Sequence, residues 1–130
     1  MSRRRSIHIE GQKHGAHPIP AASVKNGLLM SSAVYGAPGD STDPGTLDEQ
    51  CARLFRTIAD IVREAGGSPD DVVHVAIKLA DPADRAALNR HWLEMFPDPD
   101  SRPARHVDGE PLRAGGRLIA AEFTAMIDEA

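Results

Sequence analysis

Apolar residues along the chain follow two different periods, which together predict a sheet combined with two helices. Between residues 47 and 65 they recur at the helical period. Thr46 and Glu49 form a T-x-x-E capping box before this segment, and Gly66-Gly67 follows it as a stop signal. The apolar positions of this predicted helix are Leu47, Cys51, Leu54, Phe55, Ile58, Ile61, Val62 and Ala65.

Strand-like segments make up most of the remaining chain. Asn26-Gly27 predicts a hairpin with strands from about Ala22 and about Leu28, because both central residues of a type I′ turn need positive φ. Residues 72–79 form a β-branched run of strand length, with alternate residues sharing a face. We expect one face to carry Val73, Val75, Ile77 and Leu79, and the other Val72, His74, Ala76 and Lys78.

A second helix is predicted after the strand at 72–79. Asp81 is expected to cap it, with Pro82 at its first helical position and Pro97 after its end. Its apolar side is formed by Leu88, Trp92, Met95 and Phe96. Two more strands follow, so the predicted order is βββαβαββ. An α+β fold with a six-stranded mixed sheet and both helices on one face is the simplest arrangement.

The last strand, from about Arg117 to Ile127, is apolar on both faces. One face carries Ile119, Ala121, Phe123, Ala125 and Ile127, and the other Leu118, Ala120, Glu122, Thr124 and Met126. Two helices on one side leave the second face bare. We therefore expect other copies of the chain to bury it, which predicts a homo-oligomer.

Composition narrows the class of protein. A chain of 130 residues predicts a single domain, 1–130, in which about residues 1–6 are a basic tail. Its net charge of -4 disfavours a nucleic-acid partner. The single cysteine, Cys51, indicates a reducing compartment and predicts a cytoplasmic protein. No apolar run reaches the roughly 20 residues of a membrane span, so no membrane partner is expected.

No metal is predicted either. His14 and His17 have the spacing of zinc ligands, but a tetrahedral site needs three or four ligands and no third one is evident.

Two charged side chains stand out near the end of the chain. Arg105 lies in a segment that reads as a strand, and Glu122 lies in the apolar middle of the next one. A planar guanidinium binds a carboxylate through two parallel N–H donors, and a nearby carboxylate can position water. The alternative is that the two side chains form an ion pair that only stabilises the oligomer.

The chain resembles the reactive-intermediate deaminase (Rid, also YjgF) family, once labelled L-PSP endoribonucleases, over about residues 18–127. The segments that carry the resemblance are "AGGSPDDVVHVAIKLAD", "LNRHWLEMFPD", "RPARHV" and "GGRLIAAEFTAMI". The resemblance implies a chorismate-mutase-like fold and a homotrimer with three sheets around a central barrel. It also implies pockets at the subunit interfaces and no cofactor.

The resemblance further implies a reaction. The arginine matching Arg105 binds the carboxylate of a small 2-imino or 2-enamino acid. The glutamate matching Glu122 positions the water that hydrolyses the C=N bond to a 2-keto acid and ammonia. The asparagine matching Asn89 belongs to the surroundings of the pocket.

Other pocket positions depart from the family pattern. Ile19 stands in place of a tyrosine, Ala33 and Val34 replace a glycine-glutamine pair, His106 replaces a serine or threonine, and Val107 a residue that is often cysteine. Whether His106 lines the pocket or points to solvent is open at this stage. We expect a deaminase. The alternatives are a trimer that binds keto or amino acids without catalysis and, disfavoured by the acidic chain, a ribonuclease.

Overall fold

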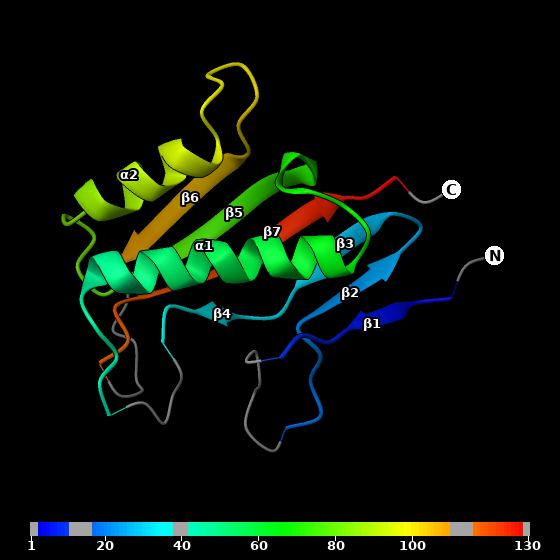
Figure 1. The fold of residues 1–130 in the computed structure, drawn as a ribbon, viewed down its shortest axis with the longest axis horizontal. Helices are drawn as coiled ribbons and strands as arrows, with labels where there is room; N and C mark the ends of the chain where they lie inside the picture. The colour runs from blue at the N-terminus through cyan, green and yellow to red at the C-terminus, as the bar shows by residue number, and fades with distance from the viewer. Residues whose placement is uncertain (1–2, 11–16, 38–41, 110–115, 129–130) are drawn as a thin grey trace.

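The computed structural model describes residues 3–10, 17–37, 42–109 and 116–128. It has two layers, a twisted mixed sheet and a pair of helices, α1 (Leu47–Glu64) and α2 (Ala86–Met95), which both cover the same face (Figure 1). A short 3-10 helix, η1 (Pro69–Asp71), precedes β5. The strands are β1 (Arg5–Ile7), β2 (Ala22–Lys25), β3 (Leu28–Ser31), β4 (Val34–Tyr35), β5 (Val72–Leu79), β6 (Ala104–Gly109) and β7 (Ile119–Met126).

The sheet follows the order β1-β2-β3-β7-β5-β6, and β4 pairs with β7 beside β3. Only β5 and β6 run parallel, and the other described pairs are antiparallel. The predicted α+β class and the two helices on one face are confirmed. Two details differ from the prediction. β4 is an additional strand of two residues, and β1 includes Arg5 and Ser6, which the sequence assigned to a basic tail.

The predicted hairpin joins β2 to β3. Asn26 and Gly27 have φ values of 52° and 84°, as a type I′ turn requires. Gly27 is also needed for space, because a Cβ there would lie 2.5 Å from the Ile127 carbonyl oxygen. The Gly27 carbonyl in turn accepts a hydrogen bond from the backbone N–H of Ile127, so the turn is attached to the end of β7.

Helix α1 begins and ends where the sequence predicts. The Glu49 backbone N–H donates to Thr46 Oγ1 at 3.2 Å, and the Thr46 N–H donates to Glu49 Oε1 at 3.0 Å. Gly66 ends the helix with φ of 99°. The buried side of α1 packs on β4 and β7, which places the core between helix and sheet (Figure 1).

Helix α2 and strand β5 depart from the predicted pattern. Asp81 does not cap α2; its carboxylate accepts from the Ala83 N–H at 3.1 Å in a separate turn, and the helix begins at Ala86. In β5 a bulge between Val72 and His74 shifts the alternation, so Val73 is 48% exposed instead of sharing a buried face with Val75.

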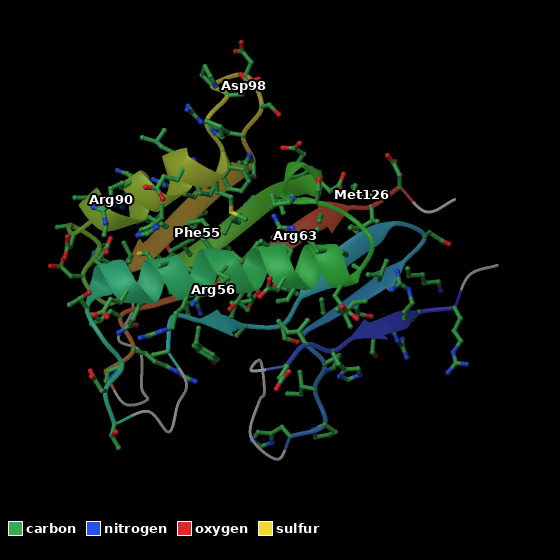
Figure 2. The ribbon with its side chains drawn as sticks, in the orientation of Figure 1. Phe55, Arg56, Arg63, Arg90, Asp98 and Met126 are labelled. Carbon is green, nitrogen blue, oxygen red and sulfur yellow. The ribbon has the colours of Figure 1, made fainter. Side chains whose placement is uncertain are left out.

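The two faces of the sheet differ as the last strand predicted. The side chains that point to the helices are buried, namely Ile119, Ala121, Phe123, Ala125 and Ile127. On the opposite face Met126 is 50% exposed and Met30, from β3, is 57% exposed. Met126 is the last residue of β7 (Figure 2). Within the described part of the chain, Met30 and Met126 are therefore left uncovered on this face.

Candidate functional site

Arg105 is held between the edge strand and the second helix. Its backbone lies in β6, opposite Val75 of β5, and its half-buried side chain turns toward α2. Arg105 Nη2 donates to Asn89 Oδ1 at 2.9 Å, and its Cζ lies 5.0 Å from the centroid of the Trp92 ring. A cation over an indole face and an amide acceptor fix the position of the guanidinium without neutralising its charge.

A polar stripe on α2 faces this guanidinium. The Asn89 backbone N–H donates to the Arg85 carbonyl oxygen at 2.9 Å, so the two residues are one helical turn apart. Arg85, Asn89 and Trp92 occupy positions i, i+4 and i+7, which lie on one side of a helix. We call these three residues the α2 stripe.

The electrostatics of the site favour an anion. Burial lowers the pKa of Arg105, and the like charge of Arg85 lowers that pKa further. Among the described residues no aspartate or glutamate forms an ion pair with either arginine. Two guanidinium groups that influence each other, and that have no carboxylate ion pair among the described residues, can attract an anion.

Arg85 is a residue of this candidate site that was not expected from the sequence. The signal was its spacing of four residues from Asn89 and seven from Trp92. The spacing gave no prediction because the helix was expected to begin at Asp81-Pro82. A helix that begins there gives residue 85 no special position.

Strand register places Arg105 and Glu122 on opposite faces of the sheet. Arg105 is opposite Val75, and Val75 is opposite Phe123, so these three share the helix-facing side. The neighbouring row joins His106 to Ala76 and Ala76 to Glu122, on the bare side. One chain therefore does not bring Arg105 and Glu122 into one cavity.

His106 is exposed on the bare face, where its Nε2 lies 3.0 Å from Asp108 Oδ1. It shares this face with Glu122 at a separation of two strands, roughly 10 Å. Glu122, in the apolar middle of the last strand, is exposed in the single chain.

The other predicted pocket residues are divided between two regions. Val107 lies on the same side of β6 as Arg105, half-buried against the core. Val34 is fully buried in β4, so its side chain belongs to the core and only its backbone is left for a substrate. Ala33 is half-buried beside it, and Ile19 is 47% exposed before β2. These last three lie on the far side of β7 from β6.

No metal or membrane feature is found in the part of the chain that the structure describes. No group of three or more His, Cys, Asp or Glu side chains there is arranged to hold a metal ion. His14 lies outside the described residues, so the zinc spacing it forms with His17 stays untested. Neither described helix has the length and apolar character needed to cross a membrane.

Comparisons with known proteins agree on one group of relatives. The family model described as "Endoribonuclease L-PSP" matches residues 18–109. "Protein mmf2, mitochondrial" from Schizosaccharomyces pombe is 36% identical over 109 residues, which cover 83% of this chain and 86% of the relative. "3-aminoacrylate deaminase RutC" from Acinetobacter baylyi is 34% identical over 89 residues, covering 68% of this chain and 69% of the relative.

The fold is also found among solved structures. A member of the "YjgF/YER057c/UK114 family" from Mycobacterium tuberculosis has a TM-score of 0.80 at 20% identity. The match covers 96% of this chain and 100% of that one. The similarity extends over the sheet and both helices, so α2 and β6, which hold Arg105, are part of the shared fold.

Proposed function

Since this chain belongs to the Rid/YjgF family, we propose that it hydrolyses small 2-imino or 2-enamino acids to 2-keto acids and ammonia. The observation that carries the proposal is Arg105, a half-buried cation held by Asn89 and Trp92 and paired with no described carboxylate. The relative named 3-aminoacrylate deaminase supports the same reaction class, because 3-aminoacrylate is a small enamine with a carboxylate.

The reaction needs little from the protein beyond the orientation of the substrate and the water. Water adds to the imine carbon, the C=N bond breaks as ammonia leaves, and a C=O bond takes its place, with no change of oxidation state. Arg105 uses one N–H for Asn89 and keeps others for the substrate carboxylate. Glu122 positions the water, accepts its proton and passes it to the nitrogen, which leaves as ammonia. Imines hydrolyse in water unaided, so positioning both reactants is a sufficient source of acceleration.

A site that uses both Arg105 and Glu122 needs two copies of the chain. Arg105 and Glu122 point away from opposite faces of one sheet. We therefore propose that a homotrimer covers the bare face and that each site takes Arg105 from one copy and Glu122 from its neighbour. Exposed Met30 and Met126 support this contact, because a monomer would leave both in water.

The direct test is Arg105→Ala. An amino-acid oxidase generates the imine in situ, and the release of 2-keto acid is followed with and without the protein. We expect kcat/KM to fall by about 100-fold or more, since the variant loses the orienting ion pair. Arg56→Ala removes an equal charge from the outer side of α1 (Figure 2) and should leave the rate unchanged. Full acceleration by Arg105→Ala would overturn the proposal.

A mixing experiment tests the shared site. Arg105→Ala and Glu122→Gln chains are unfolded together and refolded in equal amounts. If each site draws on two copies, a random trimer places an intact Arg105 beside an intact Glu122 in about a quarter of its sites, so about a quarter of the activity returns. Recovery that stays at the level of the separate variants would show that one copy supplies both residues.

A second candidate is a trimer that binds keto or amino acids without catalysis. The observation in its favour is that Arg105 and Asn89 contact each other within one chain, whereas Glu122 lies on the opposite face of the sheet. Calorimetric binding of 2-ketobutyrate, lost in Arg105→Ala, together with no acceleration of any imine would favour this function. We do not propose a ribonuclease, because the net charge of -4 disfavours binding to a phosphate backbone.

We also propose the cytoplasm as the location. Cys51 is the only cysteine and is buried and free, so nothing in the chain depends on an oxidising compartment.

A further inference from the structure

The site contains more positive charge than a single carboxylate needs. Arg105 alone has enough donors for one carboxylate, yet Arg85 lies one helical turn before Asn89, the residue that contacts Arg105, and its like charge lowers the pKa of Arg105. Two like charges side by side cost free energy unless an anion lies between or beside them. A second anionic group on the ligand would offset that cost.

Arg85 is placed to meet such a group. It is the N-terminal cap residue of α2, and its Nε donates to the Pro82 carbonyl oxygen at 2.8 Å. That bond fixes one edge of the guanidinium, and the structure gives its two Nη atoms no partner among the described residues. The terminal N–H groups are therefore available for a carboxylate of a bound molecule.

The loop that holds Arg85 is fastened to the strand that holds Arg105. Gly109, at the end of β6, lies against Pro82, and a Cβ at Gly109 would lie 2.6 Å from Pro82 Cγ. The absence of a side chain at residue 109 lets the loop close onto β6. Pro82 thus contacts β6 on one side and accepts the Arg85 hydrogen bond on the other.

We propose that this protein prefers imines of dicarboxylic amino acids, with Arg105 binding the carboxylate beside the C=N bond and Arg85 binding the side-chain carboxylate. The inference rests on the proposed function and specifies its substrate class. Arg85 is a specificity-determining residue in this arrangement, and Glu122 and the water act at the same carbon as before.

The test compares two imines made in situ, one from glutamate and one from 2-aminobutyrate. We expect the wild-type ratio of kcat/KM to favour the glutamate imine, and Arg85→Ala to lower that ratio by about tenfold, as for one lost charge-assisted contact at an exposed position. Arg85→Lys should keep part of the preference because the charge remains without the planar donor pair.

Arg90→Ala is the matched control. Arg90 lies on the same helix (Figure 2), where it pairs with Asp48 of α1. Asp48 also contacts His91 Nε2 at 2.9 Å, so this variant removes an equal charge from α2 and leaves Asp48 a partner. We expect both imines to be processed as by the wild type.

The outcomes separate the two proposals. No acceleration of either imine would overturn the proposed function. Acceleration of both, with a ratio that Arg85→Ala does not change, would leave the deaminase standing and overturn the dicarboxylate preference. Inorganic phosphate provides a third outcome. If phosphate at millimolar level inhibits the hydrolysis of both imines equally, Arg105 and Arg85 form a general anion site, which would overturn the dicarboxylate preference.

Discussion

The two helices cover the same face of the sheet but are built in opposite ways. α1 has 18 residues, a complete capping box and eight buried side chains. α2 has 10 residues, no side-chain cap and only Leu88 and Trp92 buried. Local sequence and tertiary packing both specify α1, whereas α2 depends on its contacts with the rest of the molecule.

The polar side chains of the candidate site lie on α2, the helix that its local sequence specifies less. The buried polar group of α1, Gln50, is fully used in attaching the helix, since it donates to Gly45 and Gly116 and accepts from Leu118. On α2, Asn89 accepts a hydrogen bond from Arg105, and the charge of Arg85 lowers the pKa of Arg105. One helix stabilises the fold, and the other presents side chains to the site.

Removing a core side chain from α1 should have the largest effect on stability. Ile58 is fully buried, and Ile58→Ala should lower the free energy of unfolding by about 2–5 kcal/mol because it leaves a cavity. Denaturant titration followed by circular dichroism measures the change. For a domain of this kind that loss is a large part of the total stability.

Leu93→Ala on α2 is the counterpart. Leu93 is 51% exposed, so removing it should change the free energy of unfolding by within about 0.5 kcal/mol. Equal losses in Ile58→Ala and Leu93→Ala would show that α2 is packed as fully as α1, by another copy of the chain, and would end the contrast between the helices.

On α2 the expected effect is on activity. Asn89→Ala removes the acceptor that orients Arg105 and should lower kcat/KM by about tenfold, while the exposed position keeps stability within about 0.5 kcal/mol. Asn89→Asp should lower kcat/KM by at least the same factor, through a higher KM. The new carboxylate pairs with Arg105 and competes with the substrate. Steady-state kinetics on one imine gives both values. Wild-type kinetics in both variants would mean that Asn89 does not position the arginine.

Sequence predicted the elements whose causes are local. The capping box of α1 and the Asn26-Gly27 turn are short-range patterns, and both are confirmed at the predicted residues. The bulge at Val73 was missed because it depends on how β5 pairs with β7. The prediction that Asp81 caps α2 was wrong for a related reason. An aspartate before a proline caps a helix or a turn with the same hydrogen bond.

The sequence suggested candidate site residues but not how they are arranged in space. Arg105 and Asn89 were both expected, and the structure brings them into contact. Alternation within a strand says which residues share a face of that strand, but it does not relate one strand to another. The register through Val75 and Ala76, which separates Arg105 from Glu122, requires the pairing of three strands.

The smallest expected effect concerns the cap that makes α1 independent of its surroundings. Hydrogen bonds from the Thr46 backbone, and then from its side chain, lower the pKa of Glu49 from its ordinary 4.5. Because the folded pKa lies below the unfolded one, the ionised carboxylate stabilises the fold above pH 4.5, and this contribution is lost as the pH falls through the folded value. Glu49→Gln should therefore be less stable than the wild type near neutral pH, with a difference that shrinks in acid.

Denaturant midpoints over a pH series measure this difference, and Glu64→Gln provides the matched control. Glu64 is the last residue of α1, where a negative charge opposes the helix dipole, so its removal should be neutral or slightly stabilising near neutral pH. Similar pH profiles for the two variants would show that general charge, and not the capping box, accounts for the effect. Opposite signs would establish that the capping box supports the N-terminus of α1, a side-chain cap that α2 lacks at Arg85.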